Sequence, residues 1–195
     1  MTTSNRQRVG AAVAWLSAGL AYLALEAVAA AAFRSHYSYA RNFISDLGVP
    51  SHSPMAWLMN VAFCLQGTLF LAGAVALSKA RLFLAFAAAN AIGNVLIAAF
   101  HSGPSPTAGA HVIGAVLAIV GGNAAVLAGS SIIGGWHRNV SVALGAFGLL
   151  SFVTFVIALP GAVLPLGVLE RCSVYSITAW QLLTGAWLLS RRPTL

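Results

Sequence analysis

Residues 82–101 of the chain read LFLAFAAANAIGNVLIAAFH, an apolar run that contains no Lys, Arg, Asp or Glu. A helix of about 20 such residues is long enough to cross the hydrocarbon core of a bilayer. Similar runs recur along the whole chain, which is 59% hydrophobic and 7% charged and has a mean hydropathy of +0.88. A soluble domain of this size needs far more polar surface. The sequence therefore predicts an all-α, polytopic bundle of transmembrane helices.

Six membrane spans are predicted within a single integral membrane domain over residues 1–195. Two alternatives stay open. Arg6 and Arg8 followed by an apolar run also match a cleaved signal peptide, although the run is longer than a typical signal core. Pro160 and Pro165 interrupt the fifth connection, which leaves open five spans or a re-entrant segment. The predicted spans cover approximately residues 9–33, 55–78, 82–101, 111–135, 139–163 and 167–190.

The basic residues predict the orientation of the bundle. Only Arg34 and Arg41 fall in loops on one side, while Arg171 lies within the last span. Cytoplasmic loops retain Lys and Arg, so we expect both termini in the cytoplasm and the protein in the cytoplasmic membrane. The net charge of +7 then reflects topology and anionic lipid headgroups rather than nucleic-acid binding. The basic residues on the predicted cytoplasmic side are Arg6, Arg8, Lys79, Arg81, Arg138, Arg191 and Arg192.

All acidic residues of the chain fall on the predicted outer side of the membrane, together with four of the five histidines. Charged groups inside or beside membrane spans are costly unless they are paired, and they often mark functional sites. A structural alternative is that Glu26 or Asp46 forms an ion pair with Arg171. The predicted ligand-binding residues of this outer face are Glu26, Glu170, Arg171, Asn60 and Asn94.

Asp46, His101 and His111 are the candidate catalytic residues, as acid–base or metal-binding groups. His101 and His111 end two adjacent antiparallel spans, so their imidazoles could meet and, with Asp46 or Glu26, form a His/His/carboxylate set for a divalent metal. Neutral imidazole is also a general base. The alternative is that both rings only solvate helix ends. No haem, nucleotide or flavin motif is present, so no other cofactor is predicted.

The first external loop carries a pattern typical of a short amphipathic helix. Tyr39, Phe43 and Leu47 follow each other at i+4 spacing, and Gly48 and Pro50 would close the helix. We expect this helix to lie in the interface plane as a lid, with Asp46 pointing into the bundle. The alternative is a connector that only seals the outer surface.

Amide side chains form a second polar tier deeper in the predicted bundle. Asn90 and Asn94 share one helix face at i+4 spacing. Amides in membrane helices usually form hydrogen bonds between helices. The alternative is that they extend an outward-facing cavity towards the membrane centre. The amides of this tier are Asn60, Gln66, Asn90, Asn94 and Asn123.

Several motifs resemble those of the DUF998 family of small bacterial and archaeal membrane proteins. The motifs are Ile44-Ser45-Asp46-Leu47-Gly48, Trp57-Leu58-Met59-Asn60, Gln66-Gly67 and the region from Phe100-His101 through His111 to Gly114. The family's function is unknown, so the resemblance implies the fold, with Asp46 and His111 as the positions best transferred. Family members often carry an acidic residue in the turn after the third span. Residues 102–110 lack one, which weakens a metal or acid–base role for this loop.

Two functions follow from these observations. In the first, an outward-facing polar pocket within the membrane binds a lipid or lipid-linked ligand, and in an enzymatic version also transforms it. In the second, the protein is a non-catalytic sensing or assembly protein whose polar residues are structural, and its partner is a second copy or another membrane protein. A carrier is less supported, because no inverted repeat or Gly/Pro-broken pair of spans is present. The sequence leaves open whether the protein is an enzyme.

Overall fold

The helices of the structure follow the predicted apolar runs. The structure is a computed structural model that describes residues 3–34, 36–104, 106–161 and 163–190, and this part of the chain contains helices and no strand. The all-α class is therefore confirmed. The long helices are α1 (Thr3–Ala31), α2 (Ala56–Leu77), α3 (Arg81–Ala99), α4 (Ala108–Gly129), α5 (Trp136–Ala158) and α6 (Leu166–Ser190), and a short 3-10 helix, η1 (Ser45–Gly48), lies between α1 and α2.

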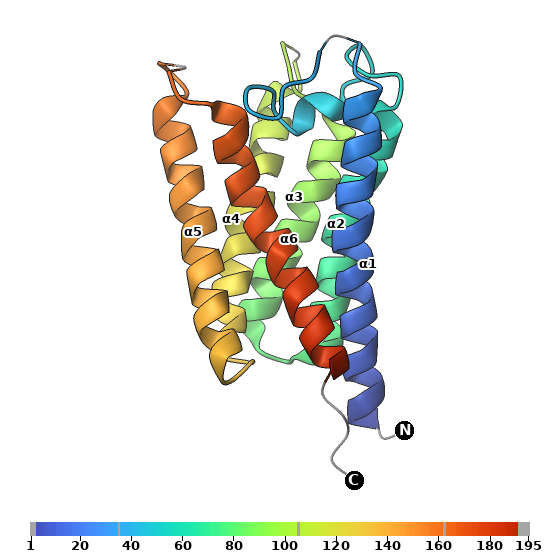
Figure 1. Cartoon of the computed structure of the whole chain (residues 1–195), viewed down its shortest axis with the longest axis vertical. Coiled ribbons are helices and arrows are strands. Elements are labelled where there is room, and N and C mark those ends of the chain that lie inside the picture. Colours follow the sequence, from blue (N-terminus) through green and yellow to red (C-terminus); the bar gives the residue numbers. More distant parts are fainter. Residues whose placement is uncertain (1–2, 35, 105, 162, 191–195) are drawn as a thin grey trace.

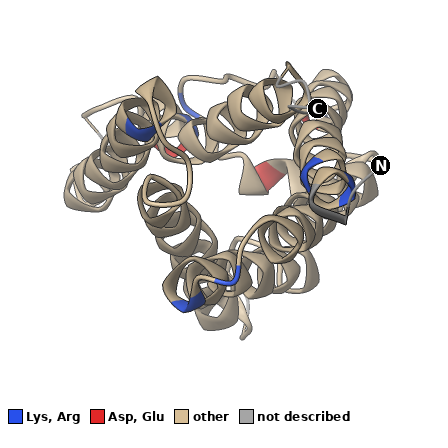
Figure 2. Cartoon of the chain, turned by 90° about the horizontal axis from the view of Figure 1, so that it is seen from below, with Lys and Arg blue, Asp and Glu red and all other residues tan. Residues whose placement is uncertain are grey.

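The six long helices form a closed ring. Each helix packs against the next one in the chain, and α6 returns to pack against α1 (Figures 1 and 2). The first span is part of this ring, since Trp15 and Tyr22 of α1 are buried within it. This packing favours a retained first span over a cleaved signal peptide. Helices α5 and α6 are two separate helices in the structure.

Five helices, α1 to α5, are long and apolar enough to cross a membrane among the residues that the structure describes. Helix α6 is of similar length, but polar side chains lower its hydropathy. These side chains face neighbouring helices, whereas exposed positions such as Leu183 and Leu189 are apolar. This distribution fits a sixth span, although the count of six spans stays a prediction. The buried polar residues of α6 include Arg171, Ser173, Ser176, Thr178, Gln181 and Thr184.

Both ends of the described chain lie at the same end of the ring (Figure 1). Figure 2 looks at this end and shows Lys and Arg positions around its rim. The α2–α3 connection with Lys79 and the start of α5 with Arg138 lie at this end as well. Arg191 and Arg192 lie outside the described residues. We call the opposite end, which carries η1, the outer end, after its predicted orientation.

The predicted interfacial helix of the first loop is wrong in its extent. Only Ser45–Gly48 are helical, and they form a 3-10 helix. The reason is that two polar side chains bond to nearby backbone N–H groups. Asn42 Oδ1 accepts a hydrogen bond of 2.9 Å from the backbone N–H of Ser38, and Asp46 Oδ2 accepts one of 3.1 Å from the backbone N–H of Phe43. Such bonds compete with a continuous helix. Leu47 is buried while Tyr39 is 45% exposed, so the predicted apolar stripe does not face one surface.

The closest backbone approach between α3 and α4 occurs at Gly93. A Cβ atom added to Gly93 would clash with the backbone nitrogen of Ala118 and would lie 2.5 Å from the carbonyl oxygen of Gly114. Both contacts are backbone atoms, which cannot rotate away. Small residues at such crossings allow membrane helices to pack closely.

We therefore expect Gly93→Ala to destabilise the protein by at least about 1–3 kcal/mol, the usual cost of overpacking. The melting temperature in detergent should fall by roughly 2–4 °C for each kcal/mol lost. Gly109→Ala is the matched control, because a Cβ there meets no atom within 4 Å. Equal melting temperatures for the two variants would contradict this packing.

Candidate functional site

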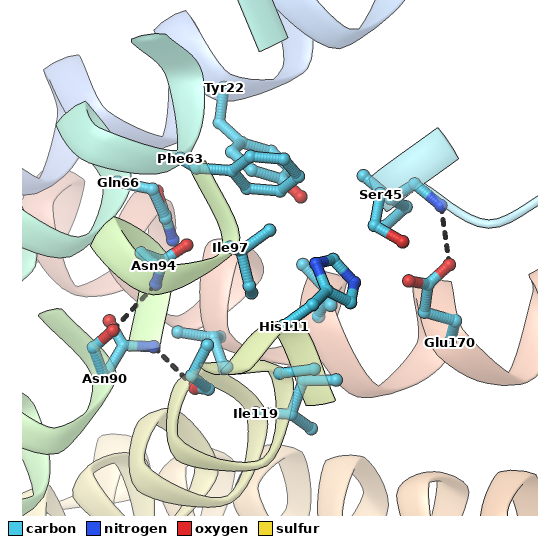
Figure 3. Close-up of a pocket in the computed structure, with 15 residues that line it drawn as sticks. Tyr22, Ser45, Phe63, Gln66, Asn90, Asn94, Ile97, His111, Ile119 and Glu170 are labelled. Atoms are coloured by element: carbon cyan, nitrogen blue, oxygen red, sulfur yellow. Dashed lines mark hydrogen bonds between the residues drawn. The ribbon is translucent and has the colours of Figure 1, made fainter. Parts of the chain in front are cut away.

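A polar cavity of about 50 Å³ lies inside the ring beneath η1 (Figure 3). Ile44 and Ser45 cover its outer end, while Ile119 and Ile177 lie deeper in the bundle. Every helix except α5 contributes to the lining. We call this space the polar cavity. Its polar lining residues are Tyr22, Ser45, Gln66, Asn90, Asn94, His111 and Glu170.

Of the predicted site residues, Glu170, His111 and Asn94 line the polar cavity. Glu170 Oε2 accepts a hydrogen bond of 2.6 Å from the backbone N–H of Ile44, which ties α6 to the loop above. The Nδ1 atom of His111 lies 2.7 Å from the carbonyl oxygen of Phe100. Because a carbonyl oxygen only accepts, Nδ1 carries the proton, and Nε2 of the neutral ring keeps its lone pair.

Part of the amide tier connects helices, and Gln66, Asn90 and Asn94 line the cavity. Asn94 Nδ2 donates to the carbonyl oxygen of Asn90 at 2.9 Å, and Asn90 Nδ2 donates to that of Ala118 at 2.6 Å. Gln66 Nε2 donates to Gln181 Oε1 at 2.5 Å. The side-chain oxygens of Gln66 and Asn90 are buried without a hydrogen-bond partner.

A buried ion pair fastens the first loop to the ring. Arg171 Nη2 lies 3.2 Å from Glu26 Oε1, so of the two partners that the structural alternative left open for Arg171 the structure selects Glu26. The Nη1 atom donates to the carbonyl oxygens of Tyr39 at 2.8 Å and Asn42 at 2.9 Å. Tyr175 completes the set by donating its hydroxyl to Glu26 Oε2 at 2.9 Å. We call this arrangement the Arg171 latch.

Two further tyrosines surround the guanidinium of Arg171. The rings of Tyr37 and Tyr39 have centroids 5.4 and 4.8 Å from its central carbon, within the range of cation–π attraction. Arg171 Nη2 also donates to the Tyr37 hydroxyl, which donates in turn to the carbonyl oxygen of Phe43. Burial raises the pKa of the Tyr37 phenol above its ordinary value, so the hydroxyl stays protonated and continues the chain of donors.

Asp46, His101 and Asn60, all predicted site residues, lie outside the lining of the polar cavity. Asp46 Oδ1 accepts from the Ser102 hydroxyl at 3.3 Å. Asn60 Nδ2 contacts the carbonyl oxygen of Gly48 at 3.0 Å and His101 Nε2 at 3.3 Å. These contacts hold η1 against α2 and the α3–α4 loop.

The predicted His/His/carboxylate metal set is not assembled in the described part of the chain. There, no three His, Cys, Asp or Glu side chains come close enough to hold a metal ion. His101 turns towards Asn60, while His111 turns towards the carbonyl oxygen of Phe100. Asp46 instead caps its own turn, so the three groups serve separate hydrogen bonds.

The predicted site set omitted Tyr22 and Ser45, and it omitted Gln66 and Asn90, which were assigned only to the amide tier. Tyr22 stands one helical turn before Glu26 on α1, and this i+4 spacing was the available signal. Ser45 belongs to the loop motif in which only Asp46 was selected. The prediction selected Asp46 because it is charged, whereas the uncharged Ser45 beside it lines the cavity.

A second hollow, the α5–α6 groove, lies on the opposite face of α6. It has a volume of about 500 Å³ and an almost entirely apolar surface. Its outer end includes Ala40, which also lines an adjoining hollow with Arg41. The groove is lined by Tyr39, Ala40, Leu144, Phe147, Val168, Arg171, Cys172, Tyr175, Ser176 and Ala179.

Comparison with known protein families matches residues 10–187 to a family described as a protein of unknown function, DUF998. The chain belongs to the DUF998 family. The resemblance of its loop and span motifs is thereby confirmed. No curated protein and no solved structure matches the chain. The function of this DUF998 protein must therefore be argued from its own residues.

The Arg171 latch predicts unequal effects for its two charged members. Arg171→Ala leaves Glu26 buried without its ion-pair partner and also releases the first loop, so we expect a loss of about 3–5 kcal/mol. Glu26→Gln should cost less, because the guanidinium keeps its carbonyl and tyrosine partners. Adding Glu26→Gln to Arg171→Ala should recover part of the loss. Melting temperatures in detergent measure these differences.

Arg34→Ala is the control for these variants, since Arg34 is an exposed arginine at the same end of the ring. Surface substitutions of this kind change stability little. An Arg171→Ala variant as stable as Arg34→Ala would show that the latch does not hold the fold together.

Proposed function

We propose that this DUF998 protein is integral to the cytoplasmic membrane and binds a lipid or lipid-linked ligand at its outer end. The hydrocarbon chain of the ligand lies in the α5–α6 groove, and its anionic headgroup lies at Arg41. The observation that carries this proposal is an apolar groove of about 500 Å³ that leads to an exposed arginine. Typical ligand sites have this size and this combination of apolar walls with few polar groups.

The position of the groove supports a ligand that arrives from within the bilayer. Its walls are α5 and α6, and side chains such as Phe147, which is 51% exposed, stand at its edge. Helix α5 is apolar enough to span the membrane, and little of it is buried in the ring. A lipid of the outer leaflet would therefore enter sideways, without transferring its chain through water.

Arg41 is better placed for a headgroup than the predicted Arg171. Both terminal nitrogens of Arg171 are used within the latch, and its side chain is buried. Arg41 is exposed, and the structure gives its side chain no hydrogen bond or ion pair within the described residues. A guanidinium binds phosphate oxygens in a bidentate manner. Arg171 instead positions Tyr39 and Ala40 at the head of the groove.

The arrangement supports binding rather than turnover at this groove. Asp46 and His101 hold η1 in place through hydrogen bonds. His111 and Glu170 line the polar cavity, and α6 separates that cavity from the groove. None of the candidate acid–base groups therefore lies where a ligand in the groove would place its headgroup.

A sensing role is the second candidate, and the Arg171 latch favours it. Arg171 lines the groove and also holds the backbone of the first loop at Tyr39 and Asn42. A ligand that alters the groove would thus alter the loop that covers the outer end. This link gives a route from lipid occupancy to the outer surface of the first loop, where a partner protein would bind.

Native mass spectrometry of the protein released gently from its membrane tests the lipid proposal. We expect the wild type to retain an anionic lipid or lipid-linked molecule. Ala179→Phe should lower its occupancy by filling the groove, and Arg41→Gln should lower it by removing the headgroup contact. Arg34→Gln, an equivalent change away from the groove, should leave it unchanged. A wild type without bound lipid, or equal occupancy in all variants, would reject the proposal.

The proposed orientation is testable with two serines that are exposed at opposite ends of the ring, Ser51 and Ser131. An impermeant thiol reagent added to intact cells should label Ser51→Cys and should label Ser131→Cys only after permeabilisation. Cys64→Ala/Cys172→Ala serves as the background to remove labelling of native thiols. The reverse pattern would place the polar cavity towards the cytoplasm.

A further inference from the structure

We propose that the polar cavity beneath η1 binds a small monovalent cation, either an alkali ion or a primary ammonium group. This site is separate from the α5–α6 groove and does not depend on the lipid proposal. Its basis is a group of acceptor side chains around an enclosed space: Asn90 Oδ1 and Gln66 Oε1 are buried without a hydrogen-bond partner, and the carboxylate of Glu170 lines the same cavity.

The orientation of two amides is fixed by their partners. Asn90 and Asn94 each donate through Nδ2 to a backbone carbonyl oxygen, at 2.6 and 2.9 Å. A carbonyl oxygen cannot donate, so the amide oxygens must be on the other side. Both side chains are buried, with 2% and 5% exposure, and Asn90 Oδ1 has no hydrogen-bond partner. These oxygens are acceptors that the protein itself leaves unused.

Gln66 and His111 add two more acceptors to the cavity lining. Gln66 donates its amide N–H to Gln181, which leaves Gln66 Oε1 and the amide nitrogen of Gln181 both buried without a hydrogen-bond partner. His111 presents the lone pair of Nε2, because its Nδ1 proton points to the carbonyl oxygen of Phe100. Unmet acceptors in a buried site cost free energy, and a bound cation would satisfy them.

The electrostatics of the cavity favour a positive ligand. Glu170 accepts one backbone hydrogen bond, from Ile44, and no Lys or Arg lines the cavity. Burial is the main penalty on the charge of Glu170, and the carboxylates of Asp46 and Glu26 add to it. Arg171 attracts it but is already paired with Glu26. A carboxylate in such a position is costly unless a positive charge accompanies it.

The ligand atoms that line the cavity suit a cation with a single positive charge. Carboxylate, amide and hydroxyl oxygens are hard ligands of the kind that alkali and alkaline-earth ions prefer. The lining supplies one carboxylate, from Glu170, which balances a monovalent ion. Within the described residues no His, Cys, Asp and Glu cluster suits a transition metal. A volume of about 50 Å³ accommodates an ion with a few water molecules, or a methylammonium-sized group.

Binding of radioactive sodium to the purified protein in detergent tests this inference. We expect saturable binding that unlabelled sodium or methylammonium displaces and that choline, which is too large, does not. The more effective competitor distinguishes an alkali ion from an ammonium group as the preferred ligand. Glu170→Gln should weaken binding by at least about tenfold, as expected for loss of a charged contact.

Asp46→Asn is the matched control, because it removes one negative charge from the same end of the ring outside the cavity lining. It should weaken binding much less than Glu170→Gln. If Glu170→Gln does not fold, Asn94→Ala removes an acceptor and preserves the charge, and it should also weaken binding. The wild-type melting temperature should rise in sodium or methylammonium chloride compared with choline chloride.

Three results would overturn the inference. One is wild-type protein without saturable sodium binding and with the same melting temperature in all the chlorides. Another is sodium binding that is unchanged in the folded Glu170→Gln or Asn94→Ala variant. The third is an equal loss in Asp46→Asn and Glu170→Gln, which would assign the effect to general surface charge rather than to the cavity.

Discussion

The buried guanidinium of Arg171 is the constraint on which the outer half of the molecule depends. It bonds to α1 through Glu26 and to the first loop through the carbonyl oxygens of Tyr39 and Asn42. This side chain thus adds an ion pair to the packing between the first and last helices, where Trp15 lies against Trp180, and it fixes the loop above them. Glu170, the preceding residue, adds a second bond to the loop at Ile44. These bonds add to those of Asn60 and Ser102 and to the burial of Leu47 in holding η1 over the polar cavity.

Hydrogen bonds from side-chain amides to backbone carbonyl oxygens allow a chain with few charged residues to contain a polar interior. In lipid, donors must find acceptors inside the protein. The amide N–H groups of Asn90, Asn94 and Asn123 all go to backbone carbonyl oxygens. Backbone carbonyls have two lone pairs and can accept this second bond, whereas N–H groups in helices are already used. The amide oxygens of Asn90 and Gln66 are then left without a partner, and both residues line the polar cavity.

The sequence was a good guide to the helices and to the pairing of charges, and a poorer guide to the site. Runs of about 20 apolar residues define α1 to α5 because the bilayer sets their length. The pairing of Glu26 with Arg171 was predictable because unpaired charge in lipid is costly. The prediction of a lid helix was wrong in its extent because Asn42 and Asp46 accept hydrogen bonds from nearby backbone N–H groups. The i+4 periodicity of the sequence does not reveal this local competition. The roles of Asp46 and His101 could not be foreseen, since spacing along the chain does not fix which way a loop side chain turns.

Helix α6 separates two hollows of opposite character, and consecutive residues serve them: Glu170 faces the polar cavity and Arg171 lines the α5–α6 groove. Each residue advances an α-helix by about 100°. Insertion or deletion of one residue in this part of α6 would turn Glu170 away from the polar cavity, or Arg171 away from the groove and the latch. The spacing from Glu170 to Ile177 is therefore bound to the geometry of both hollows at once.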